Sequence, residues 1–177
     1  CTAGSVITPL NDLIESMRAH TSTPAIVTAG AVVQALRALG VRRVAMGTPY
    51  VDFVNQREVQ FLHEHGFEVT RSLGLELGHN ERERRCIGHV PPHALYRMAV
   101  QIDSPQAEAI FISCANLATL DVIEEIERAL GKPVVTSNTA CFWACLRTLG
   151  IATPTAGFGA LLRDCAAPIV QPRPWSS

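Results

Sequence analysis

An apolar run that ends in a cysteine is the feature that most constrains how this chain can fold. Residues 109–113 are mostly apolar and include two β-branched residues, Cys114 and small residues follow, and apolar residues then recur at helical spacing up to Leu130. This order predicts a buried parallel strand, a tight turn and a helix, with Cys114 at the carboxyl end of the strand. Ligands bind at that edge of open α/β sheets, where helix N-termini favour a thiolate and attract anions. Cys114 is therefore the first candidate for chemistry.

The rest of the chain repeats this alternation of short apolar runs and helical patterns. Further strands are predicted at residues 24–27, 44–46, 67–73 and 133–136, and helices at about 11–20, 29–39, 51–65, 92–101, 139–149 and 160–163. Strands that alternate with helices of about 10 to 15 residues indicate stacked βαβ units and a parallel sheet. The segment 77–92 breaks this rhythm, and we expect it to be a mobile loop that covers the site and contains a short polar helix.

The composition excludes several classes of function. Hydrophobic residues make up 47% and charged residues 18% of the 177 positions. The formal net charge of −1 provides no excess of positive charge that would attract nucleic acid or an anionic membrane. No apolar run approaches the length of a bilayer span. The six cysteines are spread through an α/β pattern, which favours free thiols and a cytoplasmic location. Because no CxxC, GxGxxG or GxxxxGK[ST] motif occurs, we predict neither a metal nor a nucleotide cofactor.

Other residues add to the candidate site. The segment Cys1–Ser5 is a second cysteine followed by small residues, which suggests two opposed cysteines around one small carboxylate. Tyr50 lies at the end of another strand, where its hydroxyl can donate to a carboxylate, although a packing role is equally compatible with the sequence. Asn55 lies one helical turn further on and is expected to brace that turn. Asn138 precedes a helix and is predicted to be its N-cap.

Five blocks of sequence, taken in order, resemble a known superfamily. They are CTAGS at 1–5, LRALGVRRVA at 36–45, TPYVDFVN at 48–55, SCANLATLD at 113–121 and LGKPVVTS at 130–137. From Cys1 to about Leu162 the chain is similar to the aspartate/glutamate racemase superfamily, in its maleate isomerase and arylmalonate decarboxylase branch. The resemblance implies two flavodoxin-like lobes with parallel sheets and pseudo-twofold symmetry, and a cofactor-free site between them.

The resemblance also implies how the chain divides between the lobes. The first lobe is expected to contain residues 1–40 and 138–177, and the second lobe residues 41–137. The N-terminal strand and helix of the family, with an asparagine that helps to bind substrate, have no counterpart in this sequence. We therefore expect the first lobe to be incomplete at its N-terminus.

The same resemblance assigns roles to individual residues. Cys1 and Cys114 are implied as catalytic residues that face opposite sides of the substrate carbon. Their neighbouring N–H groups, with the available hydroxyls, would stabilise an enediolate-like carboxylate as a preorganised oxyanion site. The implied substrate-binding positions are Thr2, Ala3, Tyr50, Asn80, Ala115 and Asn116.

Relatives that isomerise or racemise have a cysteine from each lobe, so the resemblance implies a cofactor-independent isomerase or racemase of a small carboxylate, with maleate cis–trans isomerisation as the most specific form. One alternative is an arylmalonate-type decarboxylase that uses Cys114 alone, because the decarboxylase relative has glycine where Cys1 stands. The other alternative is an inactive fragment that binds carboxylates. The predicted partner is a small carboxylate, with no nucleic acid and no membrane, and a homo-oligomer is compatible with the sequence.

Overall fold

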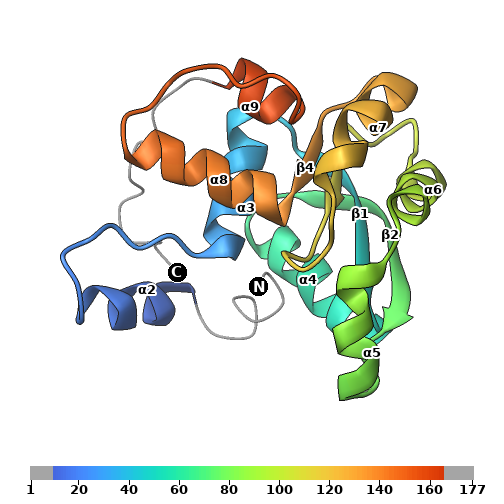
Figure 1. Ribbon diagram of the computed structural model, residues 1–177, viewed down its shortest axis with the longest axis horizontal. Helices are drawn as coiled ribbons and strands as arrows, with labels where there is room; N and C mark the ends of the chain where they lie inside the picture. Colours follow the sequence, from blue (N-terminus) through green and yellow to red (C-terminus); the bar gives the residue numbers. More distant parts are fainter. Residues whose placement is uncertain (1–9, 166–177) are drawn as a thin grey trace.

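A parallel four-stranded sheet forms the centre of the computed structural model, which describes residues 10–165 (Figure 1). The strands are β1 (Arg43–Tyr50), β2 (Glu68–Leu77), β3 (Ala109–Ile112) and β4 (Val134–Thr136), in the order β2-β1-β3-β4. All three neighbouring pairs are parallel. The α/β fold with a parallel sheet is thus confirmed.

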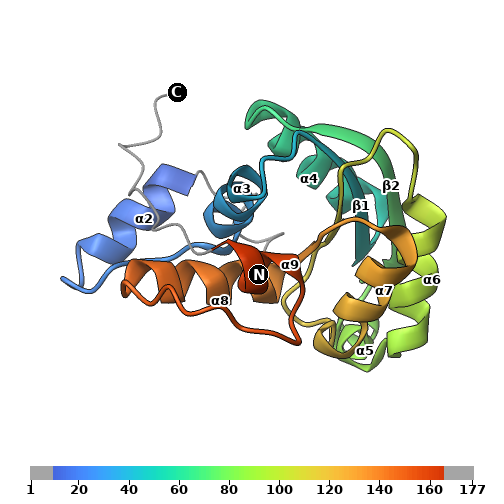
Figure 2. The same cartoon turned by 90° about the horizontal axis from the view of Figure 1, so that it is seen from above.

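Helices cover both faces of the sheet (Figures 1 and 2). One face packs against α3 (Thr28–Ala38), α4 (Asp52–Glu64) and α8 (Ser137–Thr148), and the other against α6 (Pro92–Ile102) and α7 (Ile123–Leu130). The remaining elements are α2 (Leu10–Arg18), α5 (Glu81–Cys86), α9 (Ala160–Asp164) and the 3-10 turns Ile87–His89 and Leu120–Val122. None of the helices within residues 10–165 has the length and apolarity that crossing a bilayer requires.

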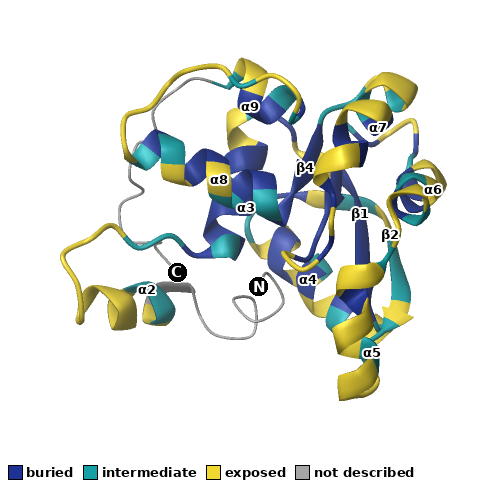
Figure 3. Ribbon diagram, viewed as in Figure 1, coloured by how far each residue is buried: buried dark blue, intermediate teal, exposed yellow. Residues whose placement is uncertain are grey.

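The core consists of two apolar layers, one on each face of the sheet (Figure 3). Successive side chains of a strand point to opposite faces. In β3, Ala109 and Phe111 accordingly join the layer under α3, α4 and α8, and Ile110 and Ile112 join the layer under α6 and α7. A strand buried on both faces needs a continuous apolar run, which explains the sequence pattern that ends at Cys114.

The strand order reverses beside β1. The chain passes from β1 to β2 on one side and then returns to β3 on the other side of β1. In doubly wound sheets the crevice at this reversal, outside the carboxyl ends of the strands, is the usual place for a ligand. Tyr50 is the last residue of β1, and Cys114 follows shortly after β3. The two residues therefore meet at the topological switch point.

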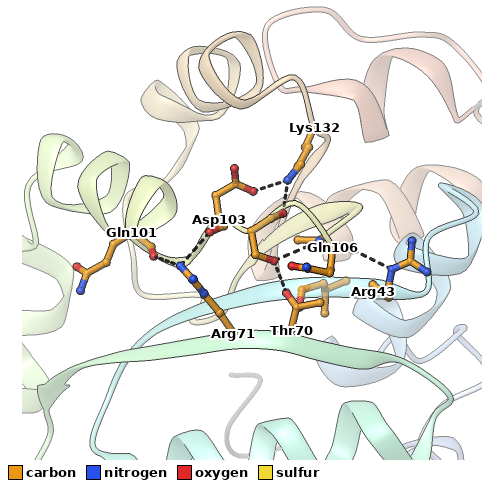
Figure 4. Close-up of polar contacts among 10 residues, drawn as sticks. Arg43, Thr70, Arg71, Gln101, Asp103, Gln106 and Lys132 are labelled. Atoms are coloured by element: carbon orange, nitrogen blue, oxygen red, sulfur yellow. Dashed lines mark hydrogen bonds and ion pairs between the residues drawn. The ribbon is translucent and has the colours of Figure 1, made fainter.

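The opposite edge of the sheet is fastened by a polar network (Figure 4). The Lys132 ammonium donates to the Asp103 carboxylate at 2.5 Å and to the Ser104 carbonyl at 2.6 Å. The Arg43 guanidinium donates to the Gln106 carbonyl at 2.8 Å. These contacts hold the loop between α6 and β3 against the starts of β1 and β4. The residues of this network have a structural role, at the edge of the sheet that lies away from Cys114.

The structure corrects two local predictions. Residues 24–27 form no strand and lead directly into α3. Asn138 does not cap α8, because the Thr136 hydroxyl accepts the Thr139 N–H at 3.1 Å and Thr139 bonds back to the Thr136 N–H. The capping residue is the last residue of β4, so α8 begins without an intervening loop. All four strands lie between residues 43 and 136, and the division of the chain into two lobes stays a prediction.

Candidate active site

Cys114 has an unusual backbone conformation at the end of β3. The Ser113 N–H still donates to the Gly47 carbonyl at 2.9 Å, which continues the ladder with β1. At Cys114 the chain turns away with φ at 119°, a value that is sterically unfavourable for any residue with a Cβ. Its N–H donates to the Ser137 hydroxyl at 3.0 Å. These bonds hold a buried thiol at the switch point in a conformation that a free chain would avoid.

Two hydrogen-bond donors lie next to the Cys114 sulfur. The Asn116 N–H donates to it at 3.4 Å, and the Tyr50 hydroxyl bonds to it from the end of β1. Burial raises the pKa of the Tyr50 hydroxyl far above its ordinary value, and the nearby Cys114 and Glu58 raise it further. Tyr50 therefore remains protonated and acts as a donor. Donors directed at a sulfur favour its anionic form.

The position of Tyr50 is set by two buried polar residues. The Thr48 hydroxyl accepts the Tyr50 N–H at 3.1 Å and donates to the Asn55 side-chain carbonyl at 3.2 Å. Asn55 lies in the first turn of α4 and is buried. The predicted brace by Asn55 is confirmed, and it joins the end of β1 to the start of α4.

The first turn of α8 holds the turn that follows Cys114. Besides the bond from Cys114 to Ser137, the Asn138 amide donates to the Leu117 carbonyl at 3.2 Å. Within the turn, the Leu117 N–H donates to the Cys114 carbonyl at 3.2 Å. These roles of Ser137 and Asn138 were not predicted. Their position directly after β4, at the same edge of the sheet as Cys114, was the available signal.

The segment between β2 and α6 packs over this region. Ile87 belongs to the same apolar cluster as Tyr50 and Cys114. Gly88 faces Asn116 so closely that a Cβ on Gly88 would lie 3.4 Å from the Asn116 side-chain oxygen. The segment contains the short helix α5, as predicted.

Asn80, the predicted carboxylate-binding residue, caps α5 in this structure. Its side-chain oxygen accepts the Glu83 N–H at 3.0 Å, and its amide donates to the Glu83 carboxylate at 2.7 Å. Both ends of the Asn80 side chain are thus occupied by Glu83. A role in holding substrate stays a prediction, and it requires Asn80 to exchange at least one of these bonds.

The described residues bring together only part of the predicted site. Tyr50, Cys114 and Asn116 meet at the switch point, and Ala115 is exposed beside them. The remaining predicted positions, Cys1, Thr2 and Ala3, lie outside the described residues. The pair of opposed cysteines therefore stays a prediction. Within residues 10–165, no group of His, Cys, Asp or Glu side chains is arranged to hold a metal ion.

Glu58 is a residue near the site that the sequence reasoning missed. It lies on α4, is only 1% exposed, and burial raises the pKa of its carboxyl to about 7, an effect that the neighbouring Ser113 hydroxyl partly offsets. Asn55, Glu58, Phe61 and Leu62 form the buried face of α4 at helical spacing. A glutamate on the apolar face of a helix was the signal that could have identified it.

Comparison with known proteins identifies both an arylmalonate decarboxylase and maleate isomerases as relatives. Residues 8–162 match the family described as arylmalonate decarboxylase. The chain is 40% identical over 157 residues to the arylmalonate decarboxylase of Bordetella bronchiseptica, covering 86% of this chain and 63% of that protein. It is 34% identical over 140 residues to the maleate isomerase of Nocardia farcinica, covering 78% of this chain and 54% of that protein. The chain thus spans less than two thirds of the length of these relatives.

Solved structures of the Nocardia farcinica enzyme have the same fold. Its maleate cis–trans isomerase bound to TRIS matches with a TM-score of 0.81 at 28% identity, covering 92% of this chain and 68% of that chain. A cysteine-to-serine mutant with a covalently bound succinylcysteine intermediate matches with a TM-score of 0.76 at 29% identity, covering 83% of this chain and 59% of that chain. These likenesses confirm the flavodoxin-like fold and the predicted resemblance. The chain belongs to the arylmalonate decarboxylase family, a branch of the Asp/Glu racemase-like superfamily whose members include maleate isomerases.

Proposed function

We propose that this chain is a cofactor-independent isomerase or racemase of a small carboxylate that uses Cys1 and Cys114, with maleate cis–trans isomerisation as its most specific form. One observation carries the proposal: Cys114 lies at the switch point of the sheet with the Tyr50 hydroxyl and the Asn116 N–H directed at its sulfur. The free thiols of the described cysteines support a reducing, cytoplasmic location.

The proposed isomerisation consists of an addition, a rotation and an elimination. The Cys1 thiolate adds to one alkene carbon of maleate. The electron pair of the double bond moves toward the other alkene carbon and onto the carboxylate that this carbon carries, which forms an enediolate. Cys114 then donates its proton to the other alkene carbon, which leaves a single bond that can rotate. After rotation the Cys114 thiolate removes that proton and the bond to Cys1 breaks, which releases fumarate. In a racemisation the two thiols would instead act as base and acid across one stereocentre.

The chain's own groups suit the charge that develops in this reaction. The enediolate carries more negative charge than the substrate, and donors that are already in place stabilise such charge at little cost in reorganisation. The protonated Tyr50 hydroxyl is one such donor, and the N–H groups of the turn at Ala115 and Asn116 are others. The braces from Thr48 to Tyr50 and from Ser137 to Cys114 keep these donors in place.

The second candidate is an arylmalonate-type decarboxylase, favoured by the 40% identity to the Bordetella bronchiseptica enzyme. In this reaction the substrate loses carbon dioxide, the electron pair of the broken bond forms an enediolate, and Cys114 alone donates a proton to it. Cys1 is then dispensable. The two candidates therefore differ in their dependence on Cys1.

The deciding experiment is proton NMR of the 177-residue chain incubated with maleate in deuterated buffer. We expect fumarate to appear, to be lost in Cys114→Ala and in Cys1→Gly, and to persist in Cys145→Ala. The last variant is a matched control, because Cys145 is an exposed thiol on α8.

Phenylmalonate in the same assay tests the alternative. Loss of carbon dioxide that persists in Cys1→Gly, together with no fumarate from maleate, would replace the isomerase by the decarboxylase. Turnover of neither substrate would contradict both and leave a fold that only binds carboxylates.

A further inference from the structure

Glu58 is a buried carboxyl group without a hydrogen-bond partner among the described residues. Its side chain is 1% exposed, and neither of its oxygens has a partner in good hydrogen-bond geometry, although the Ser113 hydroxyl lies near enough to lower the pKa of the carboxyl. A buried polar group without a partner costs free energy, and a buried charge costs far more. The fold therefore accommodates Glu58 more readily in its uncharged, protonated form.

The neighbours of Glu58 connect it to Cys114 along two routes. The first is Ser113, which directly precedes Cys114; its hydroxyl lies beside the Glu58 carboxyl, is fully buried and also makes no hydrogen bond. The second is Tyr50, whose hydroxyl lies within the electrostatic range of Glu58 and bonds to the Cys114 sulfur. Glu58 thus lies behind the switch point, and Cys114 lies at it.

The charged residues of β2, which packs against α4, have other partners or are exposed. Among the charged residues of β2, Arg71 donates to the Asp103 carbonyl, and Glu76 pairs with His79 near the surface. Glu68 is exposed at the far end of that strand. The titratable group that faces Glu58 is Tyr50 from β1, which in turn contacts the Cys114 sulfur.

We propose that Glu58 is a positioning residue of the Cys114 site: it retains its proton while Cys114 carries negative charge, and its ionisation opposes that charge through Tyr50 and Ser113. The inference rests on the proposed function, in which Cys114 becomes a thiolate once it has donated its proton. Two negative groups that share a buried region oppose each other's ionisation. An ionised Glu58 would also oppose an enediolate bound at the switch point. The site therefore works best while Glu58 is neutral.

The first test follows the carboxyl group itself in the wild-type chain. Carbon-13 NMR of protein labelled at the glutamate carboxyl carbon should show one resonance that titrates near pH 7, and this resonance should be absent from Glu58→Gln. This measurement needs no variant to be active. A Glu58 resonance that titrates near the ordinary glutamate value of 4.5 would overturn the proposal.

The second test measures the Cys114 thiol. The rate of alkylation by iodoacetamide is followed by mass spectrometry of the peptide that contains Cys114, from pH 5.5 to pH 8.5. Glu58→Gln resembles the protonated side chain, so its rate should equal the wild-type rate below pH 6. Near pH 8 it should exceed the wild-type rate roughly threefold to tenfold.

A matched control separates this coupling from a change in packing. Glu64→Gln makes the same substitution on the exposed side of α4 and should leave the alkylation profile unchanged. If Glu58→Gln changes the rate by the same factor at every pH, Glu58 is merely structural and the proposal fails.

These readouts are independent of turnover. If the chain does not convert maleate but the coupling is present, the proposed function fails and the role of Glu58 stands. If maleate is converted but Glu58 titrates normally, the opposite holds.

Discussion

The backbone at Cys114 carries strain for a structural reason. With φ at 119°, this residue occupies a region of the φ/ψ map that costs about 1–3 kcal/mol for residues with a Cβ. The bonds from Ser113 to Gly47 and from Cys114 to Ser137 hold it there. A relaxed backbone would not direct the same thiol toward Tyr50. The strain is therefore the cost of placing the sulfur at the switch point.

This strain predicts an unusual order of stability between two substitutions. Both Cys114→Gly and Cys114→Ala remove the thiol, but only glycine adopts this φ without a steric penalty. We expect Cys114→Gly to be more stable than Cys114→Ala by about 1–2 kcal/mol in urea unfolding. At Ser113, whose φ is not positive, the same pair should show the reverse order, because glycine costs more conformational entropy on folding. Equal stability of the two variants at 114 would contradict the proposed strain.

The sequence identified Cys114, Tyr50 and Asn55 because their positions follow from local patterns. Each lies at the end of a predicted strand or in the helical turn after it, and such positions share one edge of a parallel sheet. Local patterns also place Ser137 after a strand and Glu58 on the apolar face of a helix, but they do not reveal what either side chain does. Their roles depend on which elements become neighbours, and this is decided by packing rather than by local pattern.

At the scale of elements, one carboxylate links α7 to both β4 and α9. The Glu127 carboxylate on α7 accepts the Val134 N–H of β4 at 2.8 Å and the Ala160 N–H at the start of α9 at 2.9 Å. Gly159 directly precedes Ala160 and has φ at 85°. A Cβ at this position would lie 2.6 Å from an Ile123 methyl group. The junction thus requires a residue without a side chain.

Gly159→Ala should therefore destabilise the chain by more than strained backbone alone. We expect a loss of about 2–4 kcal/mol, since the clash with Ile123 adds to a conformation that is nearly exclusive to glycine. Gly150→Ala is the matched control: its φ is 74° and its Cβ would meet no atom within 4 Å. That variant should lose only about 1 kcal/mol. Equal losses in urea unfolding would show that the packing against Ile123 contributes nothing.

The prediction of helices and strands was accurate where an apolar stretch of sequence is bounded by residues that end it. The strand expected at 67–73 extends to Leu77 in the structure. Its pairing with β1 shifts in register between Thr48 and Tyr50. Near this shift the strand passes close to the end of β1 at Gly74, where a Cβ would lie 2.2 Å from the Tyr50 carbonyl oxygen. Residues 24–27 have the composition of a strand but pair with no described strand. A strand needs a partner that its own residues cannot specify, and Pro24 lacks one donor.

At the scale of the whole molecule, ionisation affects stability in two opposite directions. The half-buried Glu83 and Glu108 carboxyls accept backbone N–H groups that lower their pKa values, so they favour the folded state once they are ionised. Glu58 acts the other way, because burial raises its pKa. The pH of maximum stability therefore depends on one interior residue as well as on the surface.

Glu58 predicts that part of the stability is lost between mildly acidic and neutral pH. A carboxyl whose pKa rises from 4.5 in the unfolded chain to about 7 in the folded chain binds its proton more tightly when folded. Its contribution is fully present below pH 4.5 and is lost as the pH rises through 7, which amounts to about 3 kcal/mol. Glu58→Gln carries no such charge, and the groups remote from Glu58 titrate alike in both proteins, so their contributions cancel. In urea unfolding at pH 5, 6, 7 and 8, the free energy of the wild type relative to Glu58→Gln should fall by about this amount. A constant difference over that range would mean that Glu58 enters the folded state already ionised.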